Sequence, residues 1–443
     1  MTPPATTESP TPLLLPVRIG RFALVAYMVV AIYVGYKGLQ VWGALSGTSS
    51  RKDYWDRQHR HSARLIRNTA VRLEGLLIKA CQFAGSRADI LPADYVEILS
   101  ELHDRVPPRP FSTIGPWIED QLGRSLDSCF AYIDPRPIAA ASLAQVHRAR
   151  LDDGREVAVK VQYPDIERII ATDLANFSFF INLLARLEKR FDLRLFLKEI
   201  VELIPLELDF VNEAANARRF IANFADDPSV VFPTPFEKLS CRTVLTMTYL
   251  DGTKITDVRA LEDAGIDKRE MASLLTRAYV RQILEHGFFH GDPHPGNLLV
   301  LPGPVLAIVD LGLAKEFSAQ LRNAVITLAS AIARGDNAAV ASAFRALGFR
   351  TRSGKDDTLV LIGDVFLGQA FTTGRAYANL AMVERIGDEV FTALREDPLV
   401  EASADLLLVL RVMGLLSGIG KQLDSDVDPM AVLLPYLIGG AAS

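Results

Sequence analysis

The spacing of apolar residues predicts a helical segment first and strands after it. Over residues 53–128, apolar side chains recur at helical spacing. Over 131–162, they alternate with polar ones instead. There the turn Asp152-Asp153-Gly154 predicts a hairpin between two strands, Gln145–Leu151 and Glu156–Gln162.

The rest of the chain is predominantly helical in pattern. Helical spacing returns over 164–226, and 317–438 is almost entirely helical. Between these regions lie three strand-like runs, which are Thr243–Tyr249, Leu298–Leu301 and Val305–Val309. The apolar run Leu406–Leu416 is interrupted by Arg411, and we interpret it as core, not as a membrane span.

An apolar segment lies near the start of the chain. Residues 1–17 are rich in Pro and Thr, and we expect them to be disordered, whereas 22–36 carry no charge. The apolar stretch reaches about Leu45 if the Lys37 ammonium extends to a membrane surface. We favour a single span or a membrane-lying anchor. A buried helix is the main alternative. A signal peptide fits less well, because no basic residue precedes Leu13.

A basic run follows this segment. Residues 51–72 contain seven Lys or Arg and two Asp, a net charge of 7 − 2 = +5. Such a run next to an apolar segment can bind anionic lipid and keep the following chain in the cytoplasm. A solvated helix face would have the same composition, so both interpretations stay open.

Composition narrows the class of protein. At 443 residues we expect two to three structural units, and 49% hydrophobic residues exclude a disordered chain. The mean hydropathy of +0.18 is high for an ordinary soluble enzyme. A net charge of −5 gives no reason to expect a nucleic-acid partner. The three cysteines are far apart, which disfavours disulfides and structural zinc and fits a reducing compartment.

The most informative segment is His290-Gly291-Asp292-Pro293-His294-Pro295-Gly296-Asn297, followed by Val309-Asp310-Leu311-Gly312. An Asp with an Asn five residues later, and a second Asp before a Gly, is the catalytic-loop and metal-ligand arrangement of kinases. Asp292 would orient or deprotonate the attacking hydroxyl. Asn297 and Asp310 would supply oxygen ligands to Mg²⁺.

The same segment has an alternative interpretation as a His-rich metal site. His290, Asp292 and His294 alternate as the ligands on a strand would. The prolines at 293 and 295 argue against a regular strand there, so we favour the kinase-like interpretation.

A lysine and a glutamate fit the same chemistry. Lys160 ends the alternating run Val157-Ala158-Val159-Lys160 and can reach the nucleotide phosphates. Its expected partner is Glu213, on a helix with one polar and one apolar stripe. The separation, 213 − 160 = 53 residues, is long and implies inserted helices at 164–205.

Two further segments are weak signals when taken alone. Ala139-Ala140-Ala141-Ser142 stands where a protein kinase has its Gly-rich phosphate loop, although an Ala-rich helix start would look the same. Lys79 and Gln82 lie three residues apart, so they share one helix face, as on many surface helices.

Together these segments resemble the UbiB/AarF/ADCK family of atypical kinases, over about residues 54–437. Lys79 and Gln82 match the family's KxGQ motif, and Ala139–Ser142 match its Ala-rich loop. Glu207 and Asp209 match its ExD motif. The resemblance supports the assignments of Lys160 and Glu213 as the lysine–glutamate pair, and of Asp292, Asn297 and Asp310 in the catalytic segment.

The resemblance implies an α+β, two-lobed protein-kinase-like fold with an N-terminal helical extension. We expect a tail and anchor at 1–50, the extension at 51–128, the N-lobe at 129–250 and the C-lobe at 251–443. The nucleotide, ATP or ADP with Mg²⁺, would contact Ala139–Ser142, Lys160, Met247 and Tyr249. Lys79, Gln82, Glu207 and Asp209 would form a regulatory motif over the active site.

The family is linked to isoprenoid quinone biosynthesis and lipid metabolism, to ATPase or unorthodox kinase activity, and to membranes. We therefore expect an ATP-dependent enzyme at a membrane, with anionic lipid and proteins of quinone or lipid metabolism as partners. A nucleotide-binding scaffold without turnover is the alternative. A soluble antibiotic- or choline-type phosphotransferase fits less well, since those proteins lack the KxGQ segment.

Two departures from the family pattern, and one difference from protein kinases, bear on these expectations. Cys81 replaces the Gly of KxGQ, which leaves the regulatory role of that motif open, and Leu311 replaces the Phe of DFG. After Gly312 the pattern becomes helical almost at once, with no long activation segment to seat a peptide. We expect poor phosphorylation of peptides.

Overall fold

The computed structural model describes residues 13–46, 52–85, 92–103, 108–188, 194–363, 393, 396–397, 399–401 and 404–423. The chain divides into two compact units. The first comprises residues 1–211 and 236–247, and the second comprises 212–235 and 248–443.

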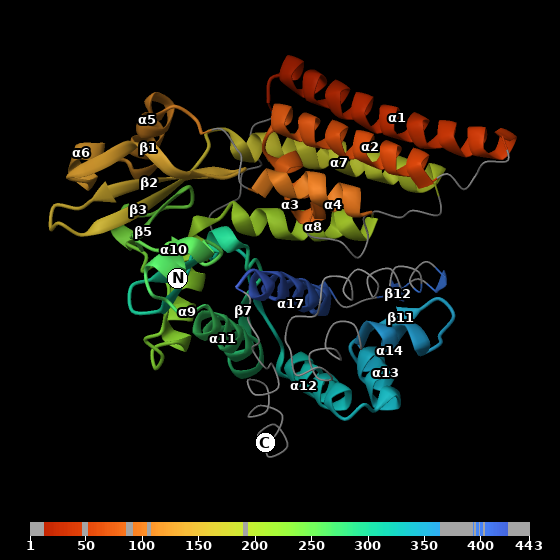
Figure 1. Cartoon of the computed structure of the whole chain (residues 1–443). Helices are drawn as coiled ribbons and strands as arrows, with labels where there is room; N and C mark the ends of the chain where they lie inside the picture. Colours follow the sequence, from red (N-terminus) through yellow and green to blue (C-terminus); the bar gives the residue numbers. More distant parts are fainter. Residues whose placement is uncertain are drawn as a thin grey trace, which may run out of the picture. The chain divides into compact units, whose positions relative to one another are not determined.

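The first unit combines a helical layer with a four-stranded sheet (Figure 1). Its helices are α1 (Leu15–Ser46), α2 (Lys52–Leu73), α3 (Leu76–Gly85), α4 (Ala93–Ser100), η1 (Glu101–His103), α5 (Phe111–Leu122), α6 (Leu126–Cys129), α7 (Ile166–Leu187), α8 (Arg194–Glu207) and η2 (Glu237–Leu239). Its strands are β1 (Tyr132–Ala140), β2 (Ala144–Arg150), β3 (Glu156–Gln162) and β5 (Val244–Thr248), the last ending at the unit boundary.

The sheet confirms the predicted hairpin. Strands run in the order β1-β2-β3-β5, and β2 pairs antiparallel with β3 so that Val146 faces Lys160. The turn between them closes with the Gly154 N–H donating to the Leu151 carbonyl over 3.0 Å, and Gly154 has a φ of +85°. Glycine adopts that left-handed conformation without steric cost, which explains why the turn ends on it.

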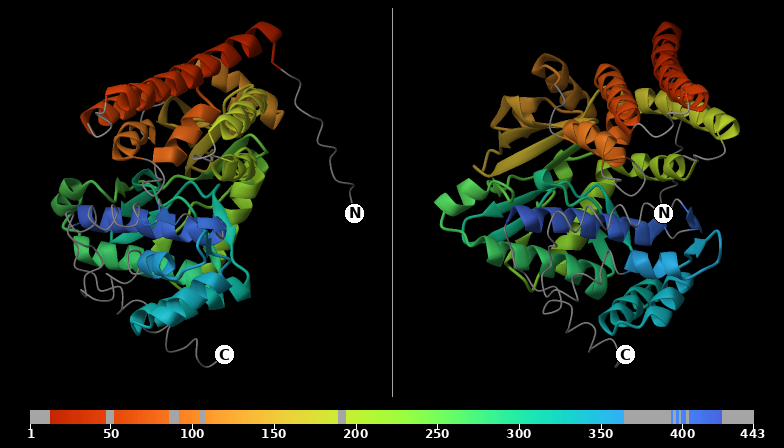
Figure 2. Two further views of the ribbon diagram at one scale, coloured as in Figure 1. Left: turned by 90° about the vertical axis from the view of Figure 1, so that its right-hand side faces the viewer. Right: turned by 45° about the vertical axis from the view of Figure 1, so that its right-hand side comes forward.

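One hydrophobic core of this unit lies within the helical layer. Buried apolar side chains of α1, α2, α3, α4 and α7 pack together, among them Val25, Ala63, Ile78, Leu99 and Phe180. The inserted helices expected at 164–205 are α7 and α8. Figure 2 shows α1 as the outermost helix of this layer, lying along α2 and α7.

Helix α1 corrects one expectation. It begins at Leu15, so residues 15–17 are helical and not disordered, because the apolar pattern already starts at Leu13. Among the described residues, two helices are long and apolar enough to cross a membrane, Leu15–Gly43 and Ile166–Leu187. The second was not anticipated from the sequence.

The second unit is mainly helical, with small sheets. Its helices are α9 (Phe210–Asn223, whose first two residues belong to the first unit), α10 (Val258–Asp263), α11 (Lys268–Val280), η3 (Arg281–Glu285), η4 (Pro295–Asn297), α12 (Ala319–Ala333), α13 (Asn337–Ala346), α14 (Asp357–Gly363) and α17 (Ala404–Gln422). Its strands are β4 (Val230–Val231), β6 (Thr253–Lys254), β7 (Phe288–His290), β8 (Leu298–Leu301), β9 (Val305–Ile308), β10 (Ala314–Glu316), β11 (Arg350–Thr351) and β12 (Leu399–Glu401).

One sheet of this unit has the order β4-β9-β8-β6, and β7 pairs with β10. The pairs β7–β10 and β11–β12 are too short for a periodicity signal and were missed in the sequence. The run Leu406–Leu416 is confirmed as core, since Val412 of α17 is fully buried in the main apolar cluster. Of the region 317–438 expected to be helical, residues 364–392, 394–395, 398, 402–403 and 424–438 lie outside the described residues.

Candidate active site

The segment between β7 and β8 forms a compact loop held by its own backbone. The Asp292 carbonyl accepts hydrogen bonds from the His294 N–H at 2.7 Å and from Asn297 Nδ2 at 3.1 Å. The Asn297 carbonyl in turn accepts from the Val309 N–H at 2.9 Å. This last bond links the loop to Val309, the residue before Asp310. The segments that carry Asp292, Asn297 and Asp310 are therefore joined by hydrogen bonds.

Asp310 has an unusual backbone. Its φ is +57°, the left-handed region that Asp and Asn tolerate better than most residues, and its side chain is exposed. Two side chains contact the backbone carbonyls of Asp310 and of the next residue, Leu311. His290 Nε2 lies 3.1 Å from the Asp310 carbonyl, and Asn216 Nδ2 donates to the Leu311 carbonyl at 2.9 Å.

The ring of His290 is fully buried and its tautomer follows from its partners. A carbonyl oxygen only accepts, so Nε2 must carry the proton that points to Asp310. Nδ1 is then an acceptor and takes a hydrogen bond from the Tyr279 hydroxyl, 2.8 Å away. Burial, with the Asp292 charge in support, raises the pKa of Tyr279 well above its usual value, which keeps the hydroxyl protonated.

These bonds exclude the alternative of a metal site on His290, Asp292 and His294. Both His290 nitrogens are engaged, and His294 Nδ1 accepts from the Gly296 N–H at 3.2 Å. Within the described ranges, no group of three or more His, Cys, Asp and Glu side chains could hold a metal ion.

Two carboxylates border the glycine after Leu311. A methyl group added at Gly312 would lie 3.5 Å from Glu213 Oε2 and 3.8 Å from Asp310 Oδ1. Glu213 is buried, at 3% exposure. Two carboxylates this close, one buried and one exposed, are stabilised by a nearby cation, which a magnesium ion or a lysine can supply.

The donor atoms present fit Mg²⁺. This ion prefers oxygen ligands, and few of them from the protein itself. The Asp310 carboxylate is exposed, and the Asn297 amide uses its nitrogen on the Asp292 carbonyl, so its oxygen is the atom left to face a metal. Asn297 and Asp310 are therefore suited to hold Mg²⁺, which would neutralise phosphate charge when bound.

In the first unit, Lys160 is buried at the centre of the sheet. It is 8% exposed, and its Nζ lies 5.2 Å from the centroid of the Phe210 ring. Phe210 directly follows the ExD segment and was missed in the sequence, where an aromatic residue at a helix start carries no signal. Lys160 and Glu213 belong to different units, so their pairing stays a prediction.

The Ala-rich segment is a turn between strands. Ala139 and Ala140 end β1, and the Ala141 N–H donates to the Ala144 carbonyl over 2.8 Å. The alternative of a helix start is wrong. The non-glycine residues with positive φ in the described chain are Glu74, Asp165 and Asp310, so this turn forms without the left-handed conformation that a Gly-rich loop uses.

The KxGQ and ExD segments meet within the first unit. Lys79 Nζ lies 2.7 Å from Glu207 Oε1, and both side chains are largely buried. Gln82 donates to the Leu102 carbonyl at 3.0 Å, whereas Asp209 accepts from the Val211 N–H at the start of α9. Cys81 is 4% exposed in the core of the helical layer, and burial raises its thiol pKa to about 12. Cys81 therefore supplies packing within the helical core.

Comparison with known proteins identifies the family. Residues 101–344 match the ABC1 atypical kinase-like domain. The uncharacterized protein sll1770 of Synechocystis is 30% identical over 435 residues, which cover 94% of this chain and 71% of that protein. The chain belongs to the ABC1 atypical kinase-like family.

Other relatives of this ABC1 protein differ in length. Protein ACTIVITY OF BC1 COMPLEX KINASE 1, chloroplastic, of Arabidopsis thaliana is 35% identical over 379 residues, covering 85% of this chain and 55% of that protein. The chain thus spans about half of the Arabidopsis relative. The solved structure of the Rv3197–erythromycin complex from Mycobacterium tuberculosis is also similar. The match covers 89% of this chain and 100% of the Rv3197 chain, with a TM-score of 0.64 and 24% sequence identity. That likeness confirms the predicted kinase-like α+β fold.

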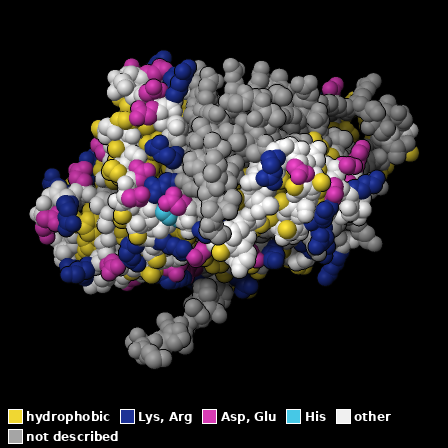
Figure 3. Space-filling view, turned by 90° about the horizontal axis from the view of Figure 1, so that it is seen from below, with side chains coloured by type: hydrophobic (Ala, Val, Ile, Leu, Met, Phe, Trp, Pro, Cys, Tyr) yellow, Lys and Arg dark blue, Asp and Glu magenta, His cyan; other side chains and the backbone are white. Residues whose placement is uncertain are grey.

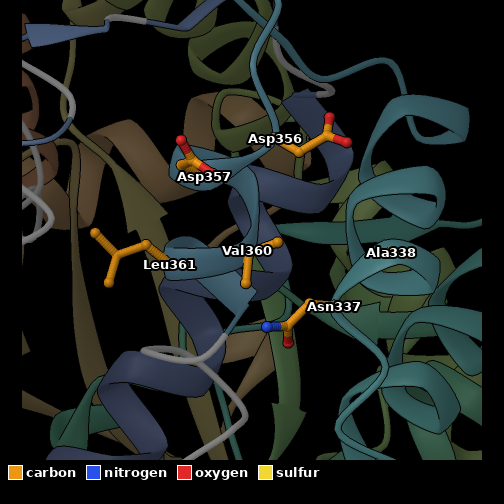
Figure 4. A pocket seen from close by; sticks show the side chains of 6 residues that line it. All are labelled: Asn337, Ala338, Asp356, Asp357, Val360 and Leu361. Carbon is orange, nitrogen blue, oxygen red and sulfur yellow. The ribbon is translucent and has the colours of Figure 1, made fainter.

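The remaining predicted site residues of the ABC1 protein are Met247 and Tyr249. Met247 is buried in β5, and the Tyr249 hydroxyl lies 3.4 Å from Asp251 Oδ1. A separate hollow between α13 and α14 includes no predicted site residue. Figure 4 shows its lining, which is Asn337, Ala338, Asp356, Asp357, Val360 and Leu361. On the face seen in Figure 3, acidic and basic side chains are interspersed and not gathered by sign.

Proposed function

We propose that this ABC1 protein is an ATP- and Mg²⁺-dependent enzyme, an ATPase or an unorthodox kinase, that supports isoprenoid quinone or lipid metabolism at a membrane. The observation that carries the proposal is the bonded assembly of Asp292, Asn297 and Asp310 in the second unit. A chain that had lost turnover would have no need to hold Asp310 in a left-handed turn, fixed by His290 and Asn216.

In the proposed reaction Asp292 orients or deprotonates the attacking hydroxyl, and Asn297 and Asp310 hold Mg²⁺ at the phosphates. Lys160 pairs with Glu213 and contacts the phosphates. Ala139–Ser142, Met247 and Tyr249 border the nucleotide. The carboxylates of Glu213 and Asp310 lie beside Gly312 and support this, since neighbouring negative charges favour the binding of a cation.

The acceptor is proposed to be water or a small molecule and not a peptide. Residues 313–318 alone lie between Gly312 and the start of α12, and three of them form β10. A protein kinase seats its peptide on a long segment at this point. Generic protein substrates should therefore be phosphorylated poorly, and robust transfer to them would contradict this part of the proposal.

The membrane part of the proposal rests on α1. This helix is a candidate for membrane contact by length and composition, and the basic helix α2 follows it. We propose that α1 associates the protein with a membrane rich in anionic lipid while the catalytic units stay in the cytoplasm. Proteins of quinone or lipid metabolism are the proposed partners, following the family resemblance.

The alternative function is a nucleotide-binding scaffold without turnover. The glycine-free Ala139–Ser142 turn favours it, because fewer backbone amides can approach the phosphates. The presence of Asp292, Asn297 and Asp310, the side chains that turnover requires, argues against the scaffold function.

ATP hydrolysis with Mg²⁺, with and without anionic vesicles, separates the two functions. The Asp310→Asn variant keeps a residue that tolerates the left-handed turn but removes the metal-binding charge. We expect at least about a 100-fold loss of turnover, the scale of losing one preorganised charged contact. Asp263→Asn, an exposed position on α10, is the matched control and should keep wild-type turnover. Equal hydrolysis by wild type and Asp310→Asn would refute the enzymatic proposal.

A further inference from the structure

The outward face of α1 carries an apolar stripe, and the charged side chain on it, Lys37, is paired with Glu188. The members of the stripe recur at helical spacing and are each at least 57% exposed, namely Ile19, Tyr27, Val30, Val34, Val41 and Leu45. At about 1.5 Å per residue the stripe runs for about 39 Å. A monomeric soluble protein rarely leaves so long an apolar face in water, which marks it as a contact surface.

The opposite face of α1 is fastened to the protein along its length by polar contacts. Near its start, Arg21 forms two buried hydrogen bonds with Asp173 of α7, at 2.7 and 2.5 Å. Further along, the Tyr36 hydroxyl lies 2.6 Å from His59 Nδ1 and 2.9 Å from the Tyr95 hydroxyl. A helix bound lengthwise through polar side chains on one side leaves its apolar side facing outward.

Helix α7 widens the stripe. Phe179 contacts Phe22 of α1, with ring centroids 5.8 Å apart, and is 53% exposed. Leu183 and Leu187 follow at helical spacing and are also exposed. Lys37 of α1 and Glu188 form an ion pair at the end of this row, with 2.5 Å between Nζ and Oε2. The two helices therefore share one apolar surface, which we call the α1–α7 surface.

Basic side chains flank this surface. The helix α2 packs beside α1 through the Trp42–Tyr54 contact, and Arg57 stacks on the same Tyr54 ring at 4.6 Å. Arg64 and Arg72 are exposed on the same helix. Such a charged helix does not enter a hydrocarbon core, whereas its arginines fit the level of anionic headgroups.

We propose that the α1–α7 surface binds an anionic lipid surface with α1 lying in the membrane plane, not across the bilayer. The apolar stripe would enter the boundary between headgroups and acyl chains, and the arginines of α2 would contact lipid phosphates. A spanning α1 would have to leave Asp173 buried without its arginine. This inference rests on the proposed membrane association and is independent of the proposed chemistry.

Vesicle binding by the full-length chain tests the surface. On vesicles of phosphatidylcholine and phosphatidylglycerol, Val34→Glu should lower partitioning about tenfold or more, because burial of one Val side chain alone contributes on that scale. Tyr132→Glu, at an exposed hydrophobic position on β1, is the control and should bind as wild type does. Arg64→Glu should weaken binding to these vesicles and leave binding to pure phosphatidylcholine unchanged.

Depth measurement separates the plane from the span. Single cysteines at Ile19, Val30 and Val41 are labelled with bimane in a Cys241→Ser background, since Cys81 and Cys129 are buried. Brominated lipids should quench the three labels equally at one shallow depth. If the protein binds but the Val30 label is by far the deepest, α1 spans, and the in-plane inference fails while membrane association stands.

Two other outcomes overturn the inference. If the wild type binds no vesicle, membrane association fails with it, while ATP hydrolysis in solution still tests the chemistry. If sedimentation shows a dimer that Val34→Glu dissociates, without vesicle binding, the α1–α7 surface is covered by a second copy of the chain.

Discussion

The ion pair between Arg21 and Asp173 gives the sharpest test of how α1 is held. Both ends are buried, with 10% of the arginine side chain and none of the aspartate side chain exposed. The residues are 152 positions apart, so the contact joins α1 to α7 and nothing local replaces it. We consider the replacement of Arg21 by Leu, which fills space without supplying charge.

The expected loss in the free energy of unfolding follows from the Asp173 charge, which stays buried without its arginine. Removing one partner of a buried pair leaves the other uncompensated, which costs about 3–5 kcal/mol. Replacing both residues by Leu removes the desolvation penalty together with the attraction, so the double variant should be within about 1 kcal/mol of wild type. In Arg21→Leu, burial raises the pKa of Asp173 with no arginine to oppose it. The folded state then binds a proton more tightly than the unfolded state, so the loss of stability relative to wild type should become smaller as the pH falls from 7 toward 4.

Urea unfolding at pH 7 and pH 5 measures these effects. Two of the three tryptophans, Trp42 and Trp55, lie at the contact of α1 with α2, so their fluorescence reports on this region. A loss below about 1 kcal/mol for Arg21→Leu would refute the argument, since an uncompensated buried charge costs more than that. A double variant that is no more stable than Arg21→Leu would also refute the argument.

Three further predictions concern single residues. Cys81→Gly should cost about 2 kcal/mol in urea unfolding, about half from glycine in a helix and half from lost burial. Tyr279→Phe should lower thermal stability by about 1–3 kcal/mol and reduce ATP hydrolysis, because it removes the donor to buried His290. Burial lowers the pKa of His147, so the stability that its neutral ring contributes is present above its usual pKa of about 6.5 and lost as the pH falls below it. His147→Gln should therefore lose less stability than wild type between pH 7 and 5; an identical pH profile would contradict this.

Local patterns were enough to predict much of the fold. The hairpin β2–β3 combines strict alternation with a turn that ends on Gly154, and both signals act within a few residues. The strand-like runs predicted at Leu298–Leu301 and Val305–Val309 form β8 (Leu298–Leu301) and β9 (Val305–Ile308), and the α+β kinase-like class followed from motif order. The start of α1 was misplaced because the Pro- and Thr-rich composition of 1–17 predicted disorder, although a proline such as Pro16 is well tolerated in the first turn of a helix.

The residues of the candidate site also fall into two groups, those that could be selected from the sequence and those that could not. Asp292, Asn297 and Asp310 carry a recognisable spacing, and so could be selected from the sequence. Their supporting residues could not. Tyr279 and Asn216 contact the site from 11 and 95 positions away, respectively, and a Tyr or an Asn in a helix has no distinctive pattern. The left-handed backbone of Asp310 is likewise visible only in three dimensions.

The long insertion between β3 and α9 gives the first unit two of its long-range polar contacts. Helix α7 supplies Asp173, which fastens α1, and α8 supplies Glu207, which pairs with Lys79 of α3. An ordinary kinase that kept Lys160 close in sequence to Glu213 would have neither contact. The proposed lipid surface and the proposed regulatory motif thus depend on one insertion. An α1 that lies in the membrane plane stays docked on α7 when the protein binds vesicles. In that case lipid should not change the rate at which a lysine-specific reagent modifies Lys79, because its pair with Glu207 stays intact. A faster modification of Lys79 in the presence of lipid would show that lipid contact is transmitted through α7 and α8 to the site.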